Sequence, residues 1–139
     1  MLKKIYSLVF CTLIIFISGQ KSHTHDKSKN DLYKAMKGKY ERDLCTPTND
    51  YGFAICELYT FTIQKDYNIL NVDGQNIEKE MKLFSEKINS DSYQIYDKQG
   101  NSIGKVYNVN GTLYFKYNNF LKAAEEKMQN KGYRFNKIE

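Results

Sequence analysis

One stretch of this chain alternates along its whole length: Phe53-Ala54-Ile55-Cys56-Glu57-Leu58-Tyr59-Thr60-Phe61-Thr62-Ile63. In an extended chain, successive side chains point to opposite faces. One face then carries an apolar and aromatic row interrupted once, by Glu57: Phe53, Ile55, Tyr59, Phe61 and Ile63. Aromatic and β-branched residues favour strands. The stretch therefore predicts a β-strand over residues 53–63.

A chain reversal precedes this strand. Residues 46–55 separate Cys45 from Cys56 and include Pro47, Asn49 and Gly52, residue types that reverse a chain. We expect a Cys45–Cys56 disulfide that ties residues 39–45 to the strand after the turn, because the spacing is not Cys-x-x-Cys and no histidine lies nearby. Tyr51, beside Gly52, is predicted to be exposed at the tip of this loop, where it would bind a ligand or partner.

Residues 1–20 have the features of a secretory signal peptide. Lys3 and Lys4 precede an apolar run over residues 5–17, and Ser18-Gly19 closes it. The run is shorter than the roughly 20 residues of a membrane span, so we expect no stable membrane anchor and a secreted or periplasmic protein. An uncleaved anchor is the less favoured alternative, and cleavage after Gly19 or after Gln20 stays open. The oxidising compartment supports the disulfide.

The rest of the chain divides into a polar tail and one domain. Residues 21–30 are predicted to be a disordered polar tail, and residues 31–139 to form a single α+β domain. A helix over residues 31–37 follows Asn30 as its N-cap, and a second helix begins after Asn119 and ends near Gly132. Residues 77–88 favour an amphipathic helix over the alternative, a strand around residues 80–84. Further strands are predicted at residues 39–45, 67–72, 92–96, 102–108, 112–117 and 133–138.

The predicted fold class is α+β, with a mainly antiparallel sheet of five or six strands and helices at both ends. The sheet would form either a sandwich or a small barrel. A short helix followed by Gly38-Lys39-Tyr40 is similar to the opening of lipocalin-like barrels, with Tyr40 in the place of tryptophan. This resemblance implies the barrel arrangement.

Residues able to carry chemistry are few. The only histidines, His23 and His25, lie in the polar tail, so the domain cannot build a Ser-His-Asp or Cys-His arrangement. If cleavage follows Gln20, His23 becomes the third residue, and the new terminus could bind copper or nickel with His23 and His25. A solvated tail is the simpler interpretation, and we expect no cofactor.

Glu57 is the most unusual residue of the alternating stretch. If its face points into a core or cavity, the carboxylate could act as a general acid or bind a cationic ligand, with Tyr59 beside it. The simpler expectation is that the strand bulges, or that the other face, with Ala54, Cys56 and Leu58, is the buried one. Glu57 and Tyr59 join Tyr51 as the candidate ligand-binding residues.

The charge balance argues against a nucleic-acid-binding protein. The net charge of +5 falls to +3 when Lys3 and Lys4 leave with the signal peptide, and most lysines alternate with acids. We therefore expect a small non-enzymatic binding protein whose partner is an unknown protein or a small apolar ligand. The alternative is a small carboxylate-dependent enzyme, a hydrolase or isomerase, that uses Glu57 in an apolar cavity.

Overall fold

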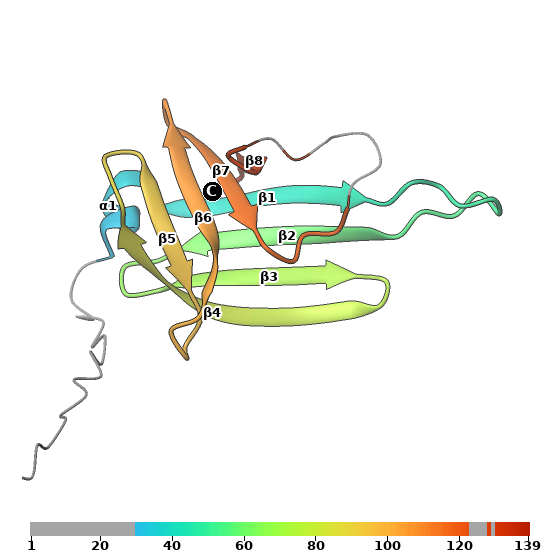
Figure 1. The fold of residues 1–139 in the computed structure, drawn as a ribbon, viewed down its shortest axis with the longest axis horizontal. Helices are drawn as coiled ribbons and strands as arrows, with labels where there is room; N and C mark the ends of the chain where they lie inside the picture. Colours follow the sequence, from blue (N-terminus) through green and yellow to red (C-terminus); the bar gives the residue numbers. More distant parts are fainter. Residues whose placement is uncertain (1–29, 123–127, 129) are drawn as a thin grey trace, which may run out of the picture.

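The computed structural model describes residues 30–122, 128 and 130–139. In these residues the chain forms a closed barrel of eight antiparallel strands, each paired with its neighbours in sequence, and one short helix (Figure 1). The elements are α1 (Asp31–Met36), β1 (Gly38–Cys45), β2 (Cys56–Ile63), β3 (Asn68–Gly74), β4 (Ile77–Lys87), β5 (Ser92–Tyr96), β6 (Ser102–Val109), β7 (Thr112–Tyr117) and β8 (Tyr133–Lys137).

Strand β4 belongs to both halves of the barrel. Its first part pairs with β3 from Ile77 to Leu83, and its last part pairs with β5 from Phe84 to Lys87. Strands β1 to β4 therefore form one long half, and β5 to β7 cross in front of it in Figure 1. The barrel closes where Tyr40 and Glu41 of β1 pair with β8.

Helix α1, which the sequence predicts as a helix, covers one end of the barrel (Figure 1). The side chain of Asn30 caps it by accepting a hydrogen bond from the Tyr33 backbone N–H at 3.3 Å. The helix ends before Gly38, whose φ of 136° is a conformation that only glycine adopts readily. Its apolar side, Leu32 and Met36, is buried in the core cluster. The predicted helix and its N-cap are thus confirmed.

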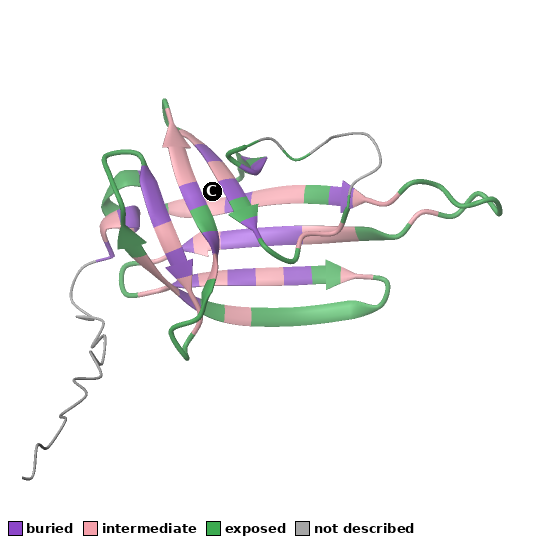
Figure 2. Ribbon diagram, in the orientation of Figure 1, coloured by how far each residue is buried: buried purple, intermediate pink, exposed green. Residues whose placement is uncertain are grey.

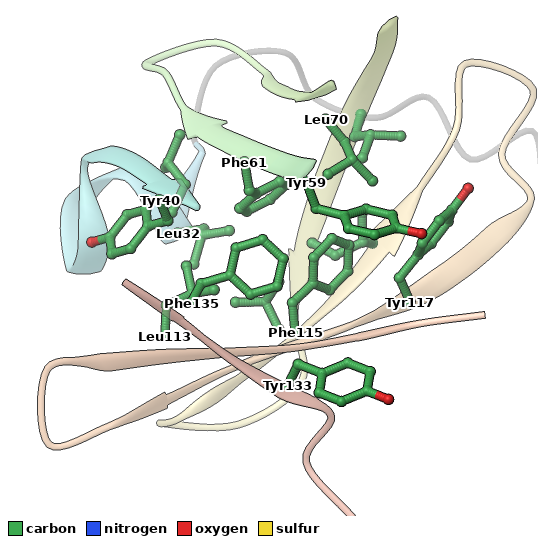
Figure 3. Packing of buried hydrophobic residues seen from close by; sticks show 14 of the residues in the cluster. Leu32, Tyr40, Tyr59, Phe61, Leu70, Leu113, Phe115, Tyr117, Tyr133 and Phe135 are labelled. Carbon is green, nitrogen blue, oxygen red and sulfur yellow. The ribbon is translucent and has the colours of Figure 1, made fainter. Parts of the chain in front are cut away.

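Aromatic side chains fill the middle of the barrel. The ring centroid of Phe115 lies 5.0 Å from that of Phe61 and 5.9 Å from that of Phe135 (Figure 3). The Phe120 ring packs against Phe115 with centroids 5.6 Å apart. Aliphatic residues pack around these rings, and all of them are fully buried: Leu32, Leu44, Leu70, Leu83, Ile95, Val106 and Leu113. Along β3 in Figure 2, buried residues alternate with more exposed ones, because every second side chain points into the barrel. Most inward residues therefore form one apolar core, and the buried polar residue Asn68 accepts a hydrogen bond from the Asn30 side chain at 3.0 Å.

The predicted α+β fold class is wrong. The structure has eight strands rather than five or six. Of the two predicted sheet arrangements, the sandwich and the small barrel, it adopts the barrel. Of the predicted C-terminal helix, Phe120, Leu121 and Lys122 are not helical, and residues 123–127 and 129 lie outside the described residues. In the part of the chain that the structure describes, no helix has the length and apolar character needed to cross a membrane.

The predicted helix over residues 77–88 is also wrong, because this segment is strand β4. The helical pattern assigned Ile77, Met81, Phe84 and Ile88 to one apolar side, but Ile77 and Ile88 are exposed. The buried residue is Leu83, which faces inward with Met81 and pairs with Asn68 of β3. Hydrogen-bonded pairing with β3 along residues 77–83 outweighs the helical spacing of the apolar residues. Tertiary context routinely overrides such local propensity.

Candidate functional site at the hairpin end

The β1–β2 hairpin projects well beyond the barrel, at the end opposite α1 (Figure 1). Cys45 and Cys56 pair across it and form the predicted disulfide, with an S–S distance of 2.06 Å. We call residues 46–55, which the disulfide closes, the hairpin loop. Strand β2 begins at Cys56, so the predicted strand over residues 53–63 starts too early. Phe53 and Ile55 belong to the hairpin loop rather than to the barrel wall.

The hairpin loop is ordered by its own hydrogen bonds. The Thr46 N–H donates to the Ile55 carbonyl at 2.8 Å, and the Thr46 hydroxyl accepts from the Ile55 N–H at 3.0 Å. At the tip, the Asn49 side-chain carbonyl accepts from the N–H groups of Tyr51 and Phe53, each at 3.0 Å. Together with the disulfide, these bonds give the loop a defined shape.

The hairpin loop presents apolar side chains to solvent. Tyr51 is 86% exposed, as predicted, Phe53 is 72% exposed and Ile55 is 42% exposed. Large apolar groups gathered on one projecting loop are unusual on a protein surface and often mark a contact site. A preordered loop also loses less conformational entropy when it binds. The loop therefore has the chemistry of a recognition element.

Glu57 lies on the inward face of β2, with the buried residues Tyr59 and Phe61. Both forms of the simpler expectation are wrong. Strand β2 pairs with β1 and β3 in a continuous register through Glu57, without a bulge, and on the other face Cys56 is exposed and Leu58 half-buried. Glu57 pairs with Gly74 of β3, and a Cβ atom at that glycine would lie 2.9 Å from the Glu57 side chain. The Glu57 side chain therefore has room beside Gly74, because glycine has no side chain.

The hydroxyl of Tyr59 links Glu57 to the β7–β8 connection. It donates a hydrogen bond to the Glu57 carboxylate and accepts one from the Leu121 backbone N–H at 2.9 Å. Phe120, next to Leu121, packs edge-to-face on the Tyr59 ring at 4.8 Å. Phe120 and Leu121 are thereby held against Tyr59 on the inward face of β2. Burial, followed by the bond to Glu57, raises the pKa of Tyr59 far above its ordinary value of 10.0.

This raised pKa predicts a loss of stability at alkaline pH. Tyr59 titrates at its ordinary value when the chain is unfolded, so its contribution is complete below pH 10.0 and is lost as the pH rises toward the folded value. For one such phenol, each pH unit in that range costs up to about 1.4 kcal/mol of unfolding free energy. Burial also raises the pKa values of Tyr40 and Tyr93, which adds to the effect. Urea unfolding at a series of pH values measures the slope.

Tyr59→Phe is the control for this titration. At neutral pH we expect it to cost about 1 to 3 kcal/mol, because the Leu121 N–H and the Glu57 carboxylate lose their partner. Above pH 10.0 its unfolding free energy should fall less steeply than that of the wild-type protein. An equal slope in both proteins would contradict the role of the Tyr59 hydroxyl.

The other sequence-predicted sites are not brought together with this one. His23 and His25, as well as residues 1–20, lie outside the described residues. Among the residues that are described, no group of three or more His, Cys, Asp or Glu side chains could hold a metal ion. Tyr51 is on the outside of the projecting loop, whereas Glu57 and Tyr59 line the inward face of β2. The three candidate ligand-binding residues therefore form two separate sites.

The sequence did not predict that Phe53 and Ile55 are exposed. Nor did it predict that Leu121 donates a hydrogen bond to Tyr59. The residue type at position 49 could have predicted that Phe53 belongs to the turn, because asparagine side chains commonly accept hydrogen bonds from the backbone of a turn. Here Asn49 accepts from the N–H groups of Tyr51 and Phe53. No comparable signal points to Leu121, because its contribution is a backbone N–H group. Comparison of the chain with protein-family models, curated proteins and solved structures gives no match.

Proposed function

We propose that this chain is a non-enzymatic interaction protein that binds a protein partner through its hairpin loop. The observation that carries the proposal is the exposure of Tyr51 and Phe53 on a loop that a disulfide and its own hydrogen bonds hold in shape. Tyrosine and phenylalanine are enriched at protein interfaces, where they bury a large area with few rotatable bonds.

The packing of the barrel interior supports a protein partner over a small apolar ligand. Tyr59, Phe61 and Phe115 lie in the barrel interior and are fully buried, and the rings of Phe61 and Phe115 pack with centroids 5.0 Å apart. Small-molecule sites are mostly preformed concave pockets. The carboxylate-dependent enzyme stays a prediction. In the structure, the Glu57 carboxylate accepts a hydrogen bond from the hydroxyl of Tyr59.

The disulfide supports a place of action outside the cytoplasm. Bonds of this kind form and persist in oxidising compartments and are rare among reduced cytosolic proteins. Together with the features of residues 1–20, this favours a secreted or periplasmic protein.

Site-specific photo-crosslinking in the source cells tests the proposal. A photoreactive phenylalanine analogue replaces Tyr51 in one variant and Gln99, an exposed residue of the β5–β6 turn, in a matched control. We expect one discrete protein adduct from position 51 and none from position 99. Adding Phe53→Ser to the position-51 variant should remove the adduct, because the partner loses its second aromatic contact.

Two outcomes would contradict the proposal. Adducts of the same size and yield from both positions would mean that contact does not depend on the hairpin loop. An apolar small molecule that stays bound in native mass spectrometry would instead show that the barrel interior is the binding site.

A further inference from the structure

The acidic residues of the barrel strands lie in one half of the barrel, although Lys39 and Lys82 also lie on the outward side of that half. Strands β5 to β8 contain no aspartate or glutamate, whereas each of β1 to β4 contains at least one. On β1 to β4, two rows of facing outward residues carry five carboxylates and no cation: Asp43, Leu58, Asp73 and Glu78 in one row, and Glu41, Thr60, Asn71 and Glu80 in the other. The alternation of charges along the sequence does not show this separation.

The outward side of β5 to β8 combines cations with tyrosines. Lys105 of β6 and Lys116 of β7 face each other directly, and both are exposed. In the next row, Tyr107 faces Tyr114, which in turn faces Arg134 of β8. We call these five residues the basic face. In the row of Lys105 and Lys116, the nearest carboxylate is that of Glu86 on β4. Gln94 of β5 lies between Glu86 and Lys105.

The Lys105–Lys116 pair opposes folding. Like charges directly opposite each other on neighbouring strands are destabilising. Among the described residues neither lysine forms an ion pair, so the fold does not offset this repulsion. A bound anion would do so, and a polymer with repeated anionic groups could contact Lys105, Lys116 and Arg134 together.

We propose that the basic face binds an acidic polysaccharide. The three cations would pair with its carboxylate or sulfate groups, and the half-exposed rings of Tyr107 and Tyr114 would lie against the sugar rings. A surface pocket of about 140 Å³ adjoins the face and is lined by Tyr107, Asn110 and Lys131, together with Asp91, Asn108 and Val109. Its amides and hydroxyl offer hydrogen-bond partners for sugar hydroxyl groups.

A polysaccharide is favoured over nucleic acid because disulfides such as Cys45–Cys56 persist in oxidising environments, cell surfaces included, and are rare in cytosolic and nuclear proteins. The basic face includes no residue of the hairpin loop, so this site is separate from the proposed protein contact. Failure of one proposal leaves the other intact.

Binding of a fluorescent polygalacturonate oligosaccharide to the purified protein, at about 0.15 M salt, tests the proposal. We expect Lys105→Glu/Lys116→Glu to weaken binding by about tenfold or more, since two attractive contacts become repulsive. The control Lys37→Glu/Lys65→Glu makes the same change of net charge at exposed positions outside the basic face, and should stay within about threefold of wild type.

A second variant keeps the test valid if the double reversal fails to fold. Lys116→Gln removes one charge of the repelling pair, so we expect a higher urea midpoint together with weaker binding. Four results would overturn the proposal: no binding by the wild-type protein, equal losses in the two double variants, equal or tighter binding of single-stranded DNA of matched charge, or salt-sensitive self-association of the wild type that Lys105→Glu/Lys116→Glu abolishes. The last result would assign the basic face to the acidic rows of a second copy.

Discussion

Phe115→Ala is expected to lower the free energy of unfolding by about 3 to 5 kcal/mol, a large part of the roughly 5 to 15 kcal/mol of a typical domain. Phe115 is fully buried, and its ring packs against those of Phe61 and Phe135, which are far apart in the sequence. Truncation removes these contacts and leaves a cavity at the centre of the barrel. Urea unfolding monitored by circular dichroism measures the loss.

Two controls define the meaning of this result. Phe53→Ala removes the same side chain from the exposed hairpin loop and should change stability by about 0.5 kcal/mol or less. Phe115→Leu, which keeps most of the volume, should cost about 1.5 kcal/mol or less. A loss below about 1 kcal/mol for Phe115→Ala would mean that the interior is loosely packed, and would favour a small apolar ligand over the protein partner.

The strands were predictable where alternation and turn residues agreed. Strand β7 matches its predicted range of residues 112–117, because Asn110-Gly111 marks the hairpin before it and alternate residues from Leu113 to Tyr117 are buried. Residues 77–88 were not predictable, since charges at Glu78, Glu80 and Lys82 fit a helix surface as well as the outer face of a strand. Only pairing with β3 distinguishes the two.

The candidate sites show the same division between local and long-range information. The exposure of Tyr51 was predictable, because its turn residues and the cysteine pair lie close together in sequence. The basic face was not, because Lys105, Lys116 and Arg134 come together only through the register of three strands. The position of Glu57 on the inward face follows the alternation of β2. Its hydrogen bond from Tyr59 joins two residues on the same face of one strand and is also local. The bond from the Leu121 N–H to Tyr59 joins residues 62 positions apart, so it depends on the tertiary fold.

The Cys45→Ser/Cys56→Ser variant is expected to lose about 2.5 to 3 kcal/mol of unfolding free energy. The disulfide joins residues separated by 11 positions, and a ring of this size removes that much chain entropy from the unfolded state. The variant should also lose the crosslinked adduct at position 51, because Tyr51 and Phe53 would no longer be held in one arrangement. Urea unfolding and the crosslinking assay measure the two effects separately.

Reduction of the wild-type protein provides the matched comparison, since it breaks the same bond without changing side-chain volume. If reduced wild type and double variant unfold at the same urea concentration, the loss belongs to the bond itself rather than to serine at these positions. Amide exchange at Phe53 and Ile55, whose N–H groups bond to Asn49 and Thr46, reports on the hairpin loop alone. Unchanged protection there after reduction would contradict the role of the disulfide in holding the loop, because the local hydrogen bonds would then suffice.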